Sequence, residues 1–308
     1  MKKERVFKSN ASKLLCFVDR LAEFKETGKM RPISLNIGLT NACNNNCPFC
    51  GYADRDKSLY IPLDKAKQIT KWYADQGALA VEIIGGGDPT MYPWLEEYVD
   101  YCEEQMLSIG MITNGRKLLG YSQEFLSKFT WIRASVNWLI ERWYGEQYEE
   151  YPTFEMPENV TFSFTYIWNE KSGPEEHDRI EKLMAANPHA VAMKVQPDVL
   201  TKEVFDIAPF SNPKIFINEK IETARSEKCY MQLIKPQVEA DGCIYRCSCG
   251  ALSKDGKMLE YRQVGTIDNP PSLEADDFDT SRCHLCFYSF YNDIFKTIEE
   301  GLLHEAFV

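Results

Sequence analysis

Between residues 33 and 197, short runs of β-branched and aromatic residues alternate with segments whose apolar residues recur every three or four positions. The runs predict buried strands, and the periodic segments predict helices with one apolar face. In the segment 63–76, for example, Leu63, Ala66, Ile69 and Tyr73 share a helical face. The predicted strands are Ile33–Leu39, Leu79–Ile84, Leu107–Thr113, Ile132–Val136, Val160–Trp168 and Ala190–Val195. The predicted helices are Leu63–Gln76, Trp94–Glu104, Gln123–Phe129 and one that opens at Pro174.

These six βα-type units predict an α/β fold with a parallel sheet, either open and doubly wound or curved toward a barrel. In both arrangements ligands gather at the carboxyl ends of the strands. Three loops with unusual composition fall at such ends. Cys43–Cys50 follows the first strand, Gly85–Thr90 the second, and Thr113–Gly115 the third.

The alternation fades near Pro197, which suggests a division of the chain. We expect a charged leader at 1–31 with one amphipathic helix over 12–27, a barrel at 32–198 and a connector at 199–228. Residues 229–308 are rich in cysteine and predict a small α+β domain.

The charge balance narrows the class of partner. The chain of 308 residues has 35 Lys and Arg against 46 Asp and Glu, a net charge of −11. This balance disfavours a nucleic-acid binder, which needs clustered basic residues. No apolar segment approaches the ~20 residues that span a bilayer, and the N-terminus has no signal-peptide pattern. The sequence therefore predicts a cytoplasmic protein without membrane contact.

In that compartment the 11 cysteines predict metal binding, because cytosolic thiols stay reduced. The sharpest motif is Cys43-Asn44-Asn45-Asn46-Cys47-Pro48-Phe49-Cys50. Three thiolates in one loop can ligate three corners of a four-iron cluster and leave one iron open to a small molecule. Half of a zinc site is the alternative. The spacing by itself does not decide between them.

The surrounding residues resemble the radical S-adenosylmethionine (SAM) superfamily. Its Cys-x3-Cys-x2-Cys loop follows the first barrel strand, often after a Thr-Asn pair such as Thr40-Asn41, with an aromatic residue before the third cysteine, here Phe49. The Gly-Gly-Glu-Pro motif of that superfamily occurs as Gly86-Gly87-Asp88-Pro89, with Asp88 in place of Glu. The resemblance implies a partial (β/α)6 TIM-type barrel, a 4Fe-4S cluster on Cys43, Cys47 and Cys50, and a loop at 86–89 that meets the methionine amino group of SAM.

The same resemblance implies further cofactor contacts at strand ends. The candidates are Asn114, Ser135, Asn137 and Lys194. For the asparagine and serine residues, the alternative is ordinary capping of the strand ends. Lys194 could instead approach a substrate anion, or be a solvated lysine. The chemistry implied is reductive cleavage of SAM to a 5′-deoxyadenosyl radical, which takes a hydrogen atom from the substrate; a flavodoxin or ferredoxin would supply the electron.

The C-terminal cysteines resemble the short "twitch" form of the SPASM extension of radical SAM enzymes. Cys229 and Cys247 flank an Asp241-Gly242 hairpin, and a Cys-x2-Cys pair follows. The match implies that Cys229, Cys247, Cys283 and Cys286 ligate a second, auxiliary 4Fe-4S cluster. Four thiolates leave no open iron, which favours electron transfer or structural support. A zinc site is the alternative.

Four cysteines remain. Cys243 and Cys249 flank Cys247, and each is a further ligand, an inert thiol, or a thiol that returns a hydrogen atom to a substrate radical. Cys102 falls on an apolar helix face, and we expect it and Cys16 to be packed in the core.

Several reactions fit these residues. The first choice is dehydrogenation of a small polar substrate such as an amine-bearing sugar or cyclitol, with the auxiliary cluster as electron acceptor. An epimerase that uses Cys249 or Cys243 as donor is the second, and modification of a ribosomal peptide the third. Only about 31 residues precede the barrel, which disfavours a separate leader-binding domain. A zinc-stabilised scaffold on a degenerate barrel represents a different class.

Overall fold

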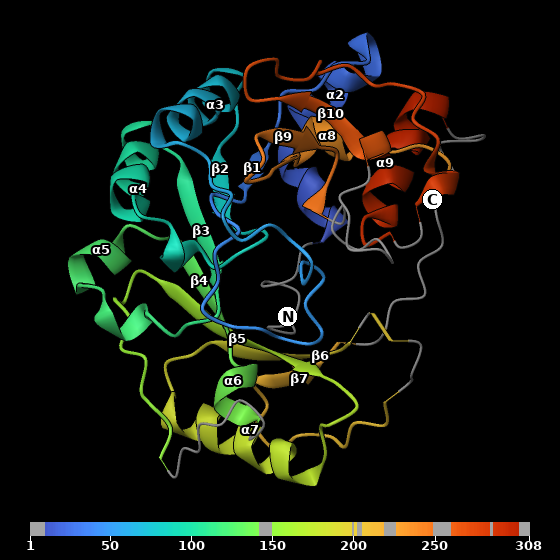
Figure 1. The fold of residues 1–308 in the computed structure, drawn as a ribbon. Coiled ribbons are helices and arrows are strands. Elements are labelled where there is room, and N and C mark those ends of the chain that lie inside the picture. The colour runs from blue at the N-terminus through green and yellow to red at the C-terminus, as the bar shows by residue number, and fades with distance from the viewer. Residues whose placement is uncertain are drawn as a thin grey trace.

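The computed structural model describes residues 10–141, 150–198, 200–201, 205–218, 226–248, 260–283 and 286–301. Figure 1 shows their arrangement: a curved sheet with helices on its outer face, capped at one end by the C-terminal segment. The strands are β1 (Ser34–Ile37), β2 (Ala80–Ile83), β3 (Ser108–Thr113), β4 (Trp131–Ser135), β5 (Thr161–Trp168), β6 (Ala192–Pro197), β7 (Ile215–Ile217), β8 (Gln237–Val238), β9 (Cys243–Tyr245) and β10 (Gln263–Thr266).

The α-helices are α2 (Val18–Thr27), α3 (Leu63–Asp75), α4 (Leu95–Glu104), α5 (Gln123–Ser127), α6 (Asn137–Ile140), α7 (Pro174–Ala186), α8 (Met231–Ile234) and α9 (Ser289–Glu300). The 3-10 turns are η1 (Ala11–Phe17), η2 (Pro89–Met91), η3 (Leu118–Gly120), η6 (Glu260–Arg262) and η7 (Thr280–Arg282).

Within the described ranges the strands form one sheet in the order β10-β9-β8-β1-β2-β3-β4-β5-β6-β7. From β8 to β7 every neighbouring pair is parallel, whereas β8-β9 and β9-β10 are antiparallel. The six predicted strands stand side by side in chain order, so the predicted α/β partial barrel is confirmed. The C-terminal segment adds a short antiparallel portion to its edge.

Alternation along the strands separates a packed outer face from a polar inner one. In β5, Phe162, Phe164 and Tyr166 are buried in the core that the sheet shares with the outer helices. Ser163 and Thr165 point to the opposite side, into the barrel. The interior of the barrel is thus left for polar side chains, and it is there that ligands can enter.

Two strands lie where the sequence pattern predicts no barrel. β7 falls inside the predicted connector and pairs with β6, and β8 comes from the predicted C-terminal domain but pairs with β1. Strands of three and two residues are too short to carry a period-2 pattern. The C-terminal segment is therefore joined to the barrel by backbone hydrogen bonds as well as by side-chain packing.

The helix predicted over 12–27 is a 3-10 turn, η1, continued by α2, which ends at Gly28 in the left-handed region with φ 69°. Its apolar face enters a second core together with α8 and α9. Phe24 meets the rings of Tyr230 and Phe295 edge-on, at centroid distances of 5.7 and 4.9 Å. The N-terminal helix thus packs on the C-terminal domain. No helix in the described ranges is long and apolar enough to cross a membrane.

Candidate functional site

The first group of predicted ligands lies at the carboxyl end of β1. Cys43, Cys47 and Cys50 sit in a loop held at its base by a bridge between Thr40 and Tyr60, and all three are half-buried. The Cys50 amide donates to the Cys47 carbonyl at 3.1 Å, which forms a tight turn between these two cysteines. The three predicted ligands thus lie in one loop at the carboxyl end of β1, and their joint binding of a cluster stays a prediction.

Nitrogen donors from three directions approach the sulfur atoms of this loop. Asn114 Nδ2 lies 3.8 Å and the Asn45 amide 3.4 Å from Cys43 Sγ, and Arg55 Nη1 lies 3.6 Å from Cys50 Sγ. N–H groups that donate to cysteine sulfur are among the contacts that tune iron–sulfur clusters. The chemistry of this donor set therefore fits a cluster held by three thiolates.

The glycine-rich loop after β2 packs directly on the backbone of the cysteine loop. Gly87 N donates to Thr40 O at 2.9 Å, and Asp88 N donates to Ala42 O at 2.8 Å. A Cβ at Gly86 would lie 2.1 Å from Asn41 Oδ1, and one at Gly87 would lie 2.2 Å from Ala42 O. Here the glycines are required by contact between two loops of the protein itself, a reason that the sequence pattern did not indicate.

Asp88 is 3% exposed and its carboxylate joins the ends of two strands. Oδ1 accepts from the Thr90 amide at 2.9 Å, and both oxygens accept from Thr113 Oγ1 at 3.0 and 2.9 Å. The Asn114 amide donates to Oδ2 at 2.5 Å. These bonds hold the loops after β2 and β3 in a fixed relation. Pro89 opens η2 directly after this residue.

The other predicted cofactor contacts lie along the same edge, in different settings. Asn114 bonds to Asn44 in the cysteine loop at 2.6 Å, and Phe49 lies half-buried between Cys47 and Cys50. Asn137 is pinned instead to β5, since its amide group bonds to both backbone groups of Ile167 at 2.8 and 2.9 Å. Ser135 ends β4, and Lys194 lies in β6 beside Thr165. Contacts of these residues with a cofactor stay a prediction.

Sequence reasoning missed a buried carboxyl group at this site. Glu239 follows β8 and is 4% exposed, and its Oε1 accepts from Tyr52 Oη at 2.8 Å. Burial raises the pKa of Glu239 to about 8, which the Tyr52 hydroxyl and the Gly86 amide partly offset. One residue from the C-terminal segment therefore links the cysteine loop to the glycine-rich loop. No local sequence signal indicates it, because 187 residues separate Glu239 from Tyr52.

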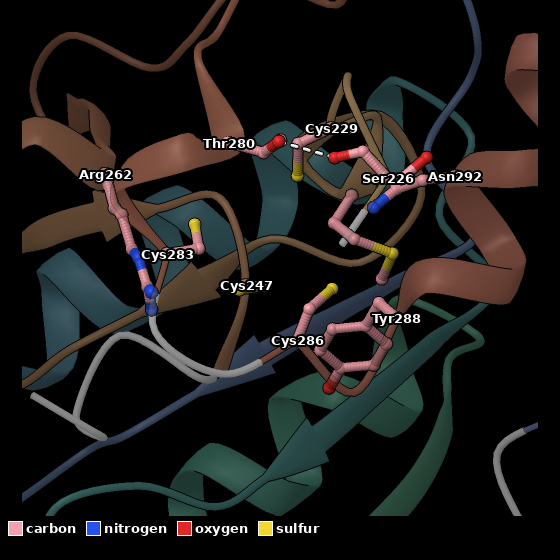
Figure 2. A pocket seen from close by; sticks show the side chains of 10 residues that line it. Ser226, Cys229, Cys247, Arg262, Thr280, Cys283, Cys286, Tyr288 and Asn292 are labelled. Carbon is pink, nitrogen blue, oxygen red and sulfur yellow. Dashed lines mark hydrogen bonds between the residues drawn. The ribbon is translucent and has the colours of Figure 1, made fainter. Parts of the chain in front are cut away.

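The second group of predicted ligands lines one small pocket of about 30 Å³. Figure 2 shows the cysteines around this space, with Arg262 on one side and Tyr288 on the other. The thiols come from four places: Cys229 before α8, Cys247 after β9, Cys283 after η7 and Cys286 before α9. The fold therefore gathers the four residues that the sequence pattern grouped.

Burial and one neighbouring cation determine the environment of these thiols. Burial raises the pKa of Cys229 to about 12, and burial also raises the pKa of Cys286. Burial lowers the pKa of Arg262, but the neighbouring Cys283 and Cys247 outweigh this, so the guanidinium stays charged beside the sulfur atoms. A cluster would exchange the buried protons of the thiols for iron, and Arg262 would offset part of its negative charge.

Nowhere in the described residues do three His, Cys, Asp or Glu side chains converge closely enough to coordinate one metal ion. A single zinc requires all of its sulfur ligands at ~2.3 Å from one point. The cysteines of a four-iron cluster each bind a different iron and so stand apart around a cage. The four cysteines line a common pocket, and which metal group they hold stays a prediction.

The leftover cysteines occupy different settings. Cys102 is fully buried in α4, as expected, but the expectation for Cys16 is wrong: its side chain is exposed, because η1 turns this position away from the second core. Cys243 lies in β9, where burial and the neighbouring Asp241 raise its pKa. It lines neither the thiol pocket nor the cavity inside the barrel. Cys249 lies outside the described residues.

A cavity of about 390 Å³ occupies the inside of the barrel. Side chains from β1 to β5 line it, among them Trp131 and Thr161 at the amino ends of β4 and β5, and Ser248 and Tyr288 of the C-terminal segment also contribute. Tyr288 also lines the thiol pocket, and its hydroxyl lies 2.7 Å from Ser248 Oγ. The barrel cavity and the thiol pocket are therefore neighbours that share one aromatic side chain. This volume suits a small-molecule ligand.

The fold is a partial α/β barrel with three cysteines in one loop at the carboxyl end of β1 and four more around a pocket in the C-terminal segment. Residues 37–131 match the family model described as the radical SAM superfamily. Over these residues, about a third of its length, the chain is similar to that superfamily, and the match implies SAM and a 4Fe-4S cluster as cofactors.

Known proteins agree at the level of fold. A nucleotide dehydratase from Flammeovirga pacifica, named as SAM-dependent, is 30% identical over 114 residues, which cover 34% of this chain and 38% of the relative. The chain thus spans little more than a third of that curated relative. SuiB of Streptococcus suis, solved with its precursor peptide SuiA, superposes with a TM-score of 0.53 at 17% identity, over 78% of this chain and 65% of SuiB.

A second solved structure, native anSMEcpe with bound AdoMet and a peptide, superposes with a TM-score of 0.50 at 12% identity. The superposition covers 87% of this chain and 96% of the anSMEcpe chain. Likeness at such low identity extends to the fold alone.

Proposed function

We propose that the protein is a radical SAM enzyme that dehydrogenates a small polar substrate bound in the barrel cavity. Cys43, Cys47 and Cys50 would hold a 4Fe-4S cluster, and the four thiols of the C-terminal pocket would hold a second. When bound, these groups supply reductive cleavage of SAM and the resulting radical chemistry. The protein's own residues bind the substrate, orient it and exclude competing hydrogen donors.

The single observation that carries the dehydrogenase proposal is the wall shared by cavity and thiol pocket. Loss of one hydrogen atom, followed by loss of one proton and one electron, oxidises a substrate by two electrons. The electron needs an acceptor close to the substrate. Tyr288 belongs to both the cavity wall and the pocket wall, so an acceptor in the pocket would lie one side chain away from the substrate.

The residues of the first site have a mechanical role in this proposal. Asp88 and Glu239 fix three loops to one another, and Asn114 and Arg55 present N–H groups to the cysteine sulfurs. Because these contacts exist within the protein itself, the edge is preorganised for a cofactor. Preorganisation reduces the cost of ordering a ligand.

An epimerase is the second candidate in the sequence, and it requires a thiol donor that faces the substrate. Cys243 does not line the cavity. The described geometry therefore favours dehydrogenation, and an epimerase would have to use Cys249.

The test uses protein reconstituted with iron and sulfide without oxygen, then mixed with dithionite, SAM and a panel of small polar substrates. The proposal expects 5′-deoxyadenosine in amounts equal to a product oxidised by two electrons. In buffer made with deuterium oxide, a product that gains one deuterium at carbon without oxidation would show an epimerase instead. Absence of 5′-deoxyadenosine from fully reconstituted protein would exclude the radical SAM activity.

A further inference from the structure

A buried carboxamide on β1 faces the barrel cavity without a hydrogen-bond partner. Asn36 is 1% exposed and lines the cavity, whereas its neighbours Leu35 and Ile37 point to the opposite side, into the core shared with the outer helices. Within the described part of the chain, no group donates a hydrogen bond to Asn36 Oδ1. Buried polar groups of native proteins are nearly always paired, so each exception requires an explanation, such as a bound molecule or a catalytic role.

The residues beside Asn36 in the sheet are engaged elsewhere or share its condition. The register of the strands places Glu82 of β2 and Gln237 of β8 on either side of it. Glu82 pairs with Lys235, whose Nζ lies 2.6 Å from Glu82 Oε1. Gln237 is fully buried and donates through Nε2 to the Val238 carbonyl at 3.0 Å, but among the described residues its Oε1 has no partner. Two adjacent strands therefore present unpaired acceptor oxygens on the inner face of the barrel.

Other parts of the cavity wall combine hydroxyl groups with apolar surface. Thr161 and Ser163 of β5 contribute hydroxyls, while Ile84 and Trp131 contribute apolar atoms. The Trp131 indole lies over β3 because Gly110 has no side chain there, and a Cβ at that glycine would collide with the ring. A wall of this kind suits a compact ring with hydroxyl groups at its edge and C–H bonds on its faces.

We propose that the barrel cavity binds a hydroxyl-bearing ring, a sugar or a cyclitol, and that Asn36 accepts a hydrogen bond from one of its hydroxyls. This inference rests on the proposed function, because it names the substrate class of that function. A hydroxyl can donate to the carboxamide oxygen and accept in turn from the hydroxyls of the wall. An analogue without that hydroxyl leaves Asn36 Oδ1 unpaired, and a site built to pair with a hydroxyl rejects such an analogue. Asn36 is therefore a specificity-determining residue.

The test compares two buried asparagines that differ in their hydrogen bonds. Asn187 is fully buried, and its Oδ1 accepts from the Phe154 amide at 2.8 Å. Its Nδ2 donates to the carbonyls of Pro152 and Leu183, each at 3.0 Å. Leucine has nearly the shape of asparagine but forms no hydrogen bonds. Asn36→Leu thus removes a carboxamide whose oxygen is unpaired, and Asn187→Leu removes one that is paired, away from the cavity.

Binding is measured on reconstituted holoenzyme by isothermal titration calorimetry under argon. Glucose and myo-inositol are the probes, and tetrahydropyran is the control ring without hydroxyls. We expect wild type and N187L to bind at least one of the two probes, and N36L to weaken that binding by about tenfold, as for one lost hydrogen bond. Asn36→Ala should weaken it similarly, which excludes obstruction of the cavity by leucine. Stronger binding of glucose identifies a sugar as substrate, and stronger binding of myo-inositol identifies a cyclitol.

Urea unfolding of the same proteins without a probe gives a second readout. Replacing a buried, unpaired polar group by an apolar group of similar shape is nearly neutral or stabilising. N36L should therefore unfold at the urea concentration of wild type or above it. N187L should unfold at a lower concentration, because the partners of Asn187 stay buried without it. If N187L does not fold, the comparison of N36L with wild type carries this readout.

Four results would overturn the inference: neither probe binds, tetrahydropyran binds as tightly as the probes, N36L and N36A bind the probes as tightly as wild type, or N36L is less stable than wild type. Each can be told apart from failure of the proposed function. Holoenzyme that forms 5′-deoxyadenosine but binds neither probe contradicts this inference alone. Probe binding that depends on Asn36 in protein unable to cleave SAM contradicts the proposed function alone.

Discussion

The two thiol sites of this protein are assembled in different ways. At the barrel edge, three half-buried cysteines lie within one loop, and neighbouring loops brace it through backbone hydrogen bonds and glycine contacts. In the C-terminal pocket, four thiols come from distant segments and are brought together by a core of α2, α8 and α9. Local sequence builds the first site, and tertiary packing builds the second.

Under the proposed function, this difference would correspond to different chemistry at the two sites. A half-exposed loop with three ligands leaves room for an exchangeable small molecule, which a cofactor that is consumed in each turnover requires. A closed pocket with four ligands and a buried arginine suits a centre that exchanges electrons and keeps its ligands. Substitutions in each site should therefore give separable defects.

The largest effect is expected for the barrel edge. Cys47→Ala should lower the rate of 5′-deoxyadenosine formation by more than about 100-fold. Loss of a ligand of the proposed cluster should reduce activity more than the 10–100-fold typical for loss of a residue that hydrogen-bonds to a metal ligand. Chromatography of quenched reactions measures it. Cys16→Ala, at an exposed position, is the control and should match wild type. Equal loss in both variants would contradict the assignment of Cys47.

The next largest effect is expected in the thiol pocket, where a substitution should impair oxidation of the substrate more than cleavage of SAM. Cys283→Ala should abolish formation of oxidised product but leave much of the SAM cleavage, because only the electron acceptor is lost. The measurement is the ratio of 5′-deoxyadenosine to oxidised product, with circular dichroism to verify folding. A variant that keeps the ratio of wild type would show that the pocket takes no part in electron transfer.

A smaller effect is expected where the two loops of the first site touch. Gly87→Ala should lower the free energy of unfolding by about 1–3 kcal/mol, the usual cost of overpacking, because its Cβ would collide with backbone atoms. Gly120→Ala is the matched control, since nothing lies within 4 Å of a Cβ at that glycine. Denaturant titration compares the two variants, and equal stability would contradict the packing argument.

The raised pKa of Glu239, which joins the C-terminal segment to the barrel edge, predicts that the stability of the protein depends on pH. Its pKa is raised from 4.5 to about 8 in the folded protein, so the native state holds a proton that the unfolded state releases in this range. The contribution of Glu239 to the free energy of unfolding should be fully present below pH 4.5. It should be lost as the pH rises toward 8, by at most about 1.4 kcal/mol per pH unit.

Glu239→Gln keeps a hydrogen-bonding side chain without the titration. The variant should therefore show a flatter profile of unfolding free energy against pH than wild type. Identical profiles from pH 5 to 8 would contradict the protonated state of Glu239.

The smallest effect is expected for Cys243, which lines neither the cavity nor the pocket. Cys243→Ala should retain the product ratio of wild type and incorporate no less deuterium from deuterated buffer. Loss of deuterium incorporation in this variant would instead identify Cys243 as a hydrogen donor and favour an epimerase.

Much of this molecule could be predicted from its sequence, for reasons visible in particular elements. The six barrel strands were predictable because residues such as Phe162 and Phe164 alternate with polar neighbours that face the interior. The cysteine loop was predictable because its ligands lie within eight residues of one another. The resemblance of the cysteine pattern around the Asp241-Gly242 hairpin to the twitch extension sufficed to group the four thiols that line one pocket in the fold.

What the sequence could not predict depends on distant contacts. Glu239 meets Tyr52 across the pairing of β8 with β1, and a strand of two residues leaves no pattern to read. The barrel cavity was likewise hidden, because the residues that line it, such as Arg133 and Lys235, are distant in sequence and come together only in the folded sheet. The reason for Gly87 was also missed, since it depends on contact between two loops.

The most direct test of the account is the metal content of protein purified without oxygen. Two four-iron clusters predict about eight irons per chain and brown protein with iron–sulfur absorption. A Cys43/Cys47/Cys50→Ala variant and a Cys229/Cys247/Cys283/Cys286→Ala variant should each keep about four irons. Colourless wild-type protein that contains zinc and no iron would contradict the account and leave a zinc-stabilised scaffold in its place.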